Sequence, residues 1–137
     1  MQATITNPDR TLQYYVIARK WLSDLEFFKI ETAYLHRLMD DYIVRLQDAD
    51  HIHRLIEVGK ELKKLEQMEI NNMLANQITQ LELMAEDVIP EDSESLAATQ
   101  VQLEYFITNL NHQFRKVKQE LFRLVLDVKH KYKIIAN

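Results

Sequence analysis

The sequence predicts an all-α protein, an up-down-up bundle of three long antiparallel amphipathic helices of coiled-coil type. The chain has 137 residues but only one Gly and two Pro. Average usage is roughly 7% Gly and 5% Pro, so a chain this poor in both has few turns. Apolar residues recur at alternating spacings of three and four, which is typical of packed helices. At this length we expect a single domain over residues 1–137.

The first helix is expected over about residues 8–47. Asn7, Pro8 and Asp9 resemble a helix start, because Asn caps well, Pro suits the first helical position and Asp complements the helix dipole. One face then carries a nearly continuous row of apolar residues, interrupted only by Thr32. Its members are Ala18, Trp21, Leu25, Phe28, Leu35, Met39, Tyr42 and Leu46.

The second helix is expected over about residues 51–89, after a turn at 47–50 in which Asp48 and Asp50 can act as N-caps. No Gly or Pro enforces this turn, so a helix that continues through it and pairs with a second chain stays open as an alternative. The apolar row changes phase between Leu65 and Ile70, which predicts a local change in helix winding. Pro90 is expected to end the helix.

The third helix is expected over about residues 93–134, starting within the polar segment 90–95. Its apolar row is unbroken and consists of Leu103, Ile107, Leu110, Phe114, Val117, Leu121, Leu124 and Val128. Charges favour three antiparallel helices. Helix two ends acidic and helix three begins acidic, whereas helix one contributes Arg10, Arg19 and Lys20 at the same end.

Composition excludes several function classes. The chain has no Cys, which rules out disulfides, Cys-ligated metals and thiol catalysis. It shows no secretory signal and no apolar run long enough for a membrane span, so we expect a cytoplasmic protein. With no Ser-His-Asp set, phosphate loop or dinucleotide fingerprint, we expect no enzyme activity, no cofactor and no small-molecule substrate.

Two polar groups suggest alternative functions. Folding the helices at their turns brings Glu31, Glu69 and His112 to a similar level, where they could hold a metal. His112, however, lies opposite the apolar row of its helix. A basic group could bind nucleic acid, although neighbouring aspartates dilute it and the net charge is −4. That group comprises Arg54, Lys63, Lys64, Lys129 and Lys131.

Surplus apolar residues provide the leading hypothesis. Phe27, Ile30 and Tyr34 form a second row on helix one, and Phe122 and Leu126 fall outside the main row of helix three. They can belong to a broad core, be covered by helix two, or form an interface. We expect a non-enzymatic interaction or assembly protein that presents these five residues to itself, as a homodimer, or to a protein partner.

Overall fold

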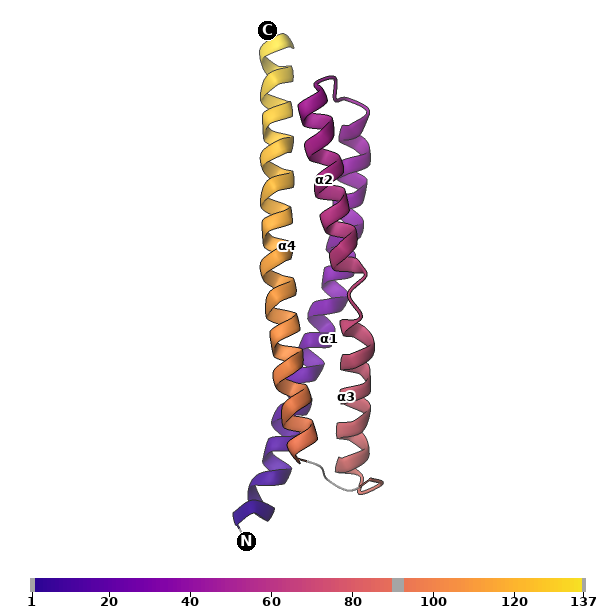
Figure 1. Cartoon of the computed structure of the whole chain (residues 1–137), viewed down its shortest axis with the longest axis vertical. Helices are drawn as coiled ribbons and strands as arrows, with labels where there is room; N and C mark the ends of the chain where they lie inside the picture. The colour runs from indigo at the N-terminus through magenta and orange to yellow at the C-terminus, as the bar shows by residue number, and fades with distance from the viewer. Residues whose placement is uncertain (1, 90–92, 137) are drawn as a thin grey trace. The chain divides into compact units, whose positions relative to one another are not determined.

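The structure, a computed structural model, confirms the all-α class. It describes the backbone of residues 2–89 and 93–136 and the side chains of residues 10–89 and 94–130. Within this part of the chain the regular elements are four α-helices and no strand (Figure 1). They are α1 (Gln2–Ile43), α2 (Ala49–Glu66), α3 (Ile70–Ala85) and α4 (Ser93–Ala136). None of the described helices is long and apolar enough to cross a membrane.

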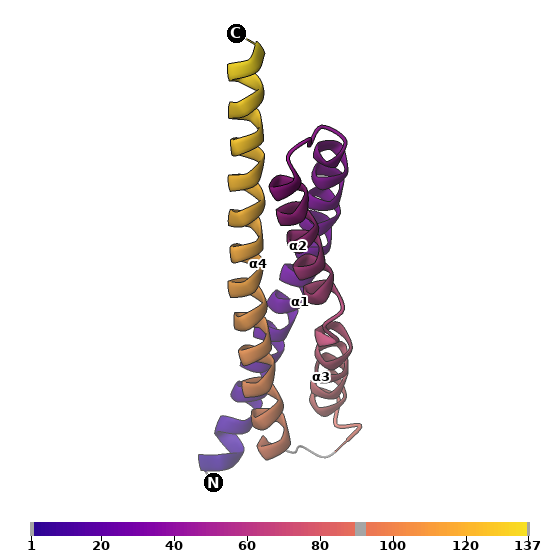
Figure 2. The same cartoon turned by 45° about the horizontal axis from the view of Figure 1, so that its top comes forward.

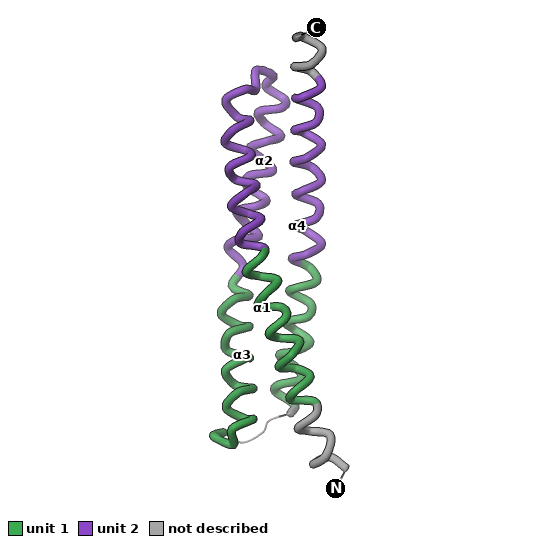
Figure 3. Tube along the Cα trace, turned by 180° about the vertical axis from the view of Figure 1, so that it is seen from behind, with its two compact units in different colours: residues 1–27, 69–109 green, residues 28–68, 110–137 purple. Residues whose placement is uncertain are grey.

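The chain divides into two compact units, each built from three helical segments (Figure 3). Unit 1 comprises residues 1–27 and 69–109, and thus the first part of α1, α3 and the first part of α4. Unit 2 comprises residues 28–68 and 110–137, and thus the rest of α1, α2 and the rest of α4. Both α1 and α4 run as single uninterrupted helices in the two views of the cartoon (Figures 1 and 2).

Unit 2 is held together by the apolar rows that the sequence predicts on its three segments. The Phe28 and Phe114 rings meet edge to face, with centroids 4.7 Å apart. The Lys118 ammonium lies over the Phe114 ring and also pairs with Glu31, 3.1 Å away. The buried cluster consists of Leu35, Met39, Tyr42, Leu55, Val58, Leu62, Phe114, Val117, Leu121, Leu124, Val125 and Val128.

Unit 1 has an apolar core with two buried amides inside it. Gln77 of α3 donates from Nε2 to the Leu96 carbonyl at 3.3 Å and to Oε1 of Gln100 at 3.2 Å. Gln100 of α4 in turn donates from Nε2 to the Tyr14 carbonyl of α1 at 3.4 Å. These bonds link all three segments of the unit. The buried apolar residues of the unit include Ala18, Leu25, Ile70, Leu74, Ile78, Leu81, Leu96, Leu103 and Ile107.

The boundaries of α1 differ from those expected. The helix begins at Gln2, so residues 7 and 8 lie inside it and the predicted N-cap at Asn7 is wrong. Capping residues mark where a helix can begin, and here the helical backbone extends back past them. At its other end α1 stops at Ile43, and the Arg45 amide bonds to the Tyr42 carbonyl. Asp48 then caps α2, as predicted, by accepting from the Asp50 amide at 2.9 Å.

The predicted second helix is interrupted at residues 67–69. α2 ends where Gln67 donates to the Lys63 carbonyl, and α3 begins at Ile70. The second of the three expected helices is therefore present but bent, with a short break between α2 and α3 where altered winding was expected. A break lets the apolar face restart at a new angle, whereas rewinding must spread the same rotation over several residues. Glu69, at the start of α3, makes no side-chain capping bond.

The end of α3 is a Schellman motif. Asp87 has a positive φ of 59°, and its amide donates to the Met84 carbonyl at 3.2 Å. The Val88 amide donates to the Leu83 carbonyl at 2.9 Å. This pairing satisfies the last carbonyls of a helix and usually places Gly at the left-handed position. The helix thus ends at Ala85, before Pro90 is reached.

Candidate functional site

Phe27, Ile30 and Tyr34 form an exposed apolar surface, here named the outer stripe of α1. Their exposed fractions are 59%, 66% and 53%. Tyr34 lies nine residues after the buried Leu25, and Ile30 nine residues before the buried Met39. Nine residues are about two and a half helical turns, so each pair lies on opposite sides of the helix. The outer stripe therefore faces away from the core.

The second half of α4 has a comparable surface, here named the outer face of α4. It consists of five exposed residues at spacings of four, three, four and three: Arg115, Gln119, Phe122, Leu126 and Lys129. This spacing places them on one side of the helix. Phe122 is 44% exposed and Leu126 is 64% exposed.

The outer face of α4 carries positive charge without acidic residues among its five members. The stretch 110–130 contains only two carboxylates, and both contact Arg54 of α2. Glu120 Oε1 lies 3.2 Å from Arg54 Nη2, and Asp127 Oδ2 lies 3.5 Å from Nη1. Among the described side chains, neither Arg115 nor Lys129 makes an ion pair. The face thus combines two apolar side chains with two cations that have no partner in the described structure.

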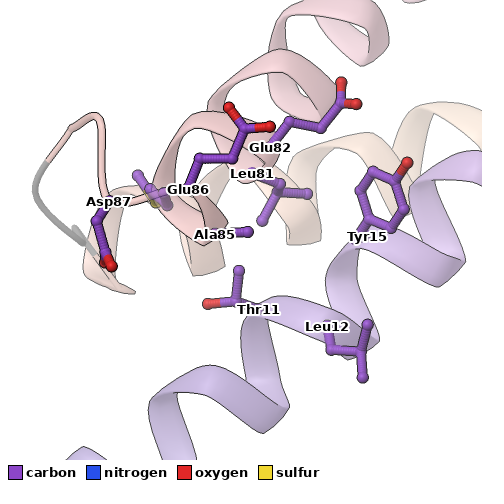
Figure 4. Close-up of a pocket in the computed structure, with 9 residues that line it drawn as sticks. Thr11, Leu12, Tyr15, Leu81, Glu82, Ala85, Glu86 and Asp87 are labelled. Carbon is purple, nitrogen blue, oxygen red and sulfur yellow. The ribbon is translucent and has the colours of Figure 1, made fainter.

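Unit 1 contains a groove of about 510 Å³ between α1 and the end of α3 (Figure 4). Leu81 and Ala85 point from α3 toward the α1 segment that carries Thr11 and Tyr15 (Figure 4). Leu81 is fully buried near the C-terminal end of α3, whereas Leu12 on the α1 side is exposed. Such a volume lies within the range of pockets that accept small molecules or bulky side chains.

The lining of this groove is acidic. Glu82, Glu86 and Asp87 contribute carboxylates, and no Lys or Arg is among the described lining residues. All three carboxylates are exposed and belong to the end of α3, and in Figure 4 those of Glu82 and Glu86 point away from Thr11 and Leu12. A cationic group with an apolar neighbour is chemically matched to this combination.

The structure does not group the residues considered for metal binding. Glu31 of unit 2 pairs with Lys118, His112 is exposed on α4, and Glu69 of unit 1 is exposed at the start of α3. No group of three or more His, Asp and Glu suited to a metal ion occurs among the described residues.

The basic residues considered for nucleic-acid binding are dispersed or neutralised. Arg54 contacts two carboxylates, and Lys64 lies 3.4 Å from Glu61. Lys63 and Lys129 are exposed on different helices, and the side chain of Lys131 lies outside the described residues. Of this group, only Lys129 belongs to the surfaces described above.

Sequence reasoning placed the exposed stripes but missed the groove. The acidic end of the second helix was visible in the sequence, because Glu82, Glu86 and Asp87 lie within six residues. The groove beside these residues depends on where α3 ends and on how α1 packs next to that end. A local sequence pattern does not determine this packing. Comparison of the chain with protein-family models, with curated proteins and with solved structures found no match.

Proposed function

We propose that this chain is a non-enzymatic assembly protein, an up-down-up helical bundle that forms a homodimer through the outer stripe of α1. The observation that supports this most is the exposure of Phe27, Ile30 and Tyr34 on the side of α1 opposite its buried residues. Burying a large apolar side chain gains roughly 1.5–3 kcal/mol. A two-fold interface uses the same patch from both copies and so recovers this energy twice.

Contacts within unit 2 support the up-down-up arrangement. Phe28 of α1 contacts Phe114 of α4. Three residues later on α1, Glu31 contacts Lys118, which lies four residues after Phe114, so the two segments run in the same direction. His36 Nε2 lies 2.8 Å from Glu66 Oε1 at the end of α2. Since α2 begins shortly after α1 ends, contact between its last residue and His36, seven residues back from the end of α1, favours an antiparallel pair.

The charges along α1 favour an antiparallel pairing of the two copies. Arg19 and Lys20 lie eleven and ten residues before Ile30, while Asp40 and Asp41 lie ten and eleven residues after it. All four are exposed, and none makes an ion pair among the described side chains. An antiparallel pair centred near Ile30 sets each cationic end beside the acidic end of its partner. A parallel pair would juxtapose like charges.

The test is the molar mass of the protein in solution, measured by light scattering after gel filtration. Wild type is expected to be a dimer at tens of micromolar, and Phe27→Glu/Tyr34→Glu a folded monomer, because four buried carboxylates would face each other across the axis. Val101→Glu is the matched control: Val101 is 68% exposed on α4, outside the outer stripe, and its substitution should leave the mass unchanged.

Charge reversal at the ends tests the antiparallel register. Arg19→Glu and Asp41→Lys should each weaken the dimer, and the double variant should restore it, because residues 19 and 41 face each other in a pair centred on Ile30. A monomeric wild type contradicts the proposal. Unfolding of Phe27→Glu/Tyr34→Glu, judged by circular dichroism, contradicts it as well, because it would place the stripe in the core.

A further inference from the structure

We propose that the chain has a second self-contact, in which the outer face of α4 of one copy docks into the acidic groove in unit 1 of another copy. This contact uses no residue of the outer stripe of α1, so it goes beyond the dimer proposed above and can exist without it. The two surfaces differ in character, which makes the contact heterologous, whereas the α1 pairing joins identical surfaces.

Charge complementarity between the two surfaces carries the inference. The groove presents Glu82, Glu86 and Asp87 with no described basic residue in its lining. The outer face of α4 presents Arg115 and Lys129 with no acidic member. Interfaces that match a positive patch to a negative one are favoured in encounter and disfavour wrong partners.

The outer face has no acidic member, and the carboxylates beside it on α4 are held by a contact with α2. Glu120 and Asp127 are the only carboxylates on this stretch of α4, and Arg54 engages both. Arg54 therefore offsets part of the negative charge beside the outer face, and Arg123 lies 3.6 Å from Glu120 as well.

Apolar complementarity gives the contact an anchor. Phe122 and Leu126 lie one turn apart between Arg115 and Lys129, and both are exposed. The groove offers an interior with Leu81, Met84 and Tyr15 among its lining residues, in a volume of about 510 Å³. Insertion of Phe122 into the groove, with a flanking cation against the carboxylates at the end of α3, would resemble a typical interface, with an aromatic anchor beside a polar rim.

A heterologous contact repeats, because every copy retains one free groove and one free face. The expected product is a ring or an open chain of molecules, according to whether the rotation closes. Combined with the two-fold α1 pairing, it would link dimers into larger assemblies.

The experiment pairs two charge-reversed proteins at low ionic strength and measures mass by sedimentation velocity. The face variant is Arg115→Glu/Lys129→Glu, and the groove variant is Glu82→Lys/Glu86→Lys. Wild type should form species larger than a dimer that dissociate as salt is raised. Each variant alone should assemble at least about tenfold more weakly, because its two surfaces repel. An equimolar mixture should regain assembly, since each variant then meets an opposite charge.

Lys63→Glu/Lys64→Glu is the matched control, with the same change in net charge on α2, and should assemble as wild type does. Repeating the series in the Phe27→Glu/Tyr34→Glu background separates the two contacts. If the mixed variants regain assembly in that background, the contact between the outer face of α4 and the groove is supported, whether or not the α1 dimer exists. Phe122→Ser, a neutral change at an exposed site, should also weaken assembly and tests the anchor without charge reversal.

Two results overturn the inference. One is a wild type that never exceeds a dimer at several hundred micromolar and low salt. The other is an equimolar mixture of the two variants that stays as dissociated as each variant alone. If, in addition, Arg115→Glu/Lys129→Glu loses binding to anionic phosphatidylserine vesicles, the outer face of α4 is assigned to a membrane surface.

Discussion

Asp87 shows how a single residue ends a helix in a chain with almost no glycine. Its backbone has a φ of 59°, a conformation that costs an L-residue roughly 1–2 kcal/mol, and Asn and Asp tolerate it better than most. The two amide bonds of the Schellman motif offset this cost by satisfying carbonyls at the end of α3. The same residue lines the groove, so the local geometry of the helix end also shapes a proposed contact surface.

Asp87→Gly should raise the free energy of unfolding by up to about 1 kcal/mol, because Gly adopts positive φ without a steric penalty. Glu86→Gly is the control. Its φ is −91°, so Gly offers no steric relief there and only adds flexibility to the unfolded chain. Urea denaturation measures both. Equal destabilisation by the two substitutions would show that Asp87 is not strained.

The three segments of unit 1 are held in register by a buried amide pair as well as by apolar packing. Gln77 and Gln100 are 4% and 6% exposed, and every described buried polar side-chain atom has a hydrogen-bond partner. A polar residue in an apolar helix interface commonly fixes register at some cost in stability. Here the bonds reach one backbone carbonyl on α4 and one on α1, so a shifted helix would lose them.

Gln77→Leu should lower the free energy of unfolding by about 1–3 kcal/mol, because Oε1 of Gln100 is then buried without its donor. Gln77→Leu/Gln100→Leu should cost less than the sum of the single changes, since no unpaired amide remains. The double-mutant cycle, measured by chemical denaturation, should give a coupling within about 0.5–3 kcal/mol. Strict additivity would mean that the two amides do not act as a network.

At the level of the molecule, self-association and stability are linked. If folded copies pair and unfolded ones do not, mass action adds stability as protein concentration rises. The thermal midpoint of wild type should therefore increase by a few degrees between micromolar and high micromolar concentrations. That of Phe27→Glu/Tyr34→Glu should stay constant. Scanning calorimetry over a concentration series measures this, and parallel behaviour of the two proteins would argue against the α1 interface.

The sequence by itself determined the helical class and most buried positions. Scarce glycine and a spacing of three and four leave few alternatives to long helices, and Leu110, Leu121 and Leu124 are buried as their spacing predicts. The turn capped by Asp48 was also readable, because capping is a local interaction between a side chain and nearby amides. The exposure of Ile30 follows from the same periodicity, since it lies off the main apolar row.

Only the tertiary structure decided how these elements end and what lies between them. The phase change near Leu65 permitted either a rewound helix or a break, two solutions that the same residues allow. The structure breaks the helix, which ends α2 at Glu66 and starts α3 at Ile70. The groove beside Leu81 and the pairing of Arg54 with Glu120 depend on residues 66 or more positions apart. Periodicity reports which side of a helix is apolar, but contacts between distant segments are set by packing that no local spacing records.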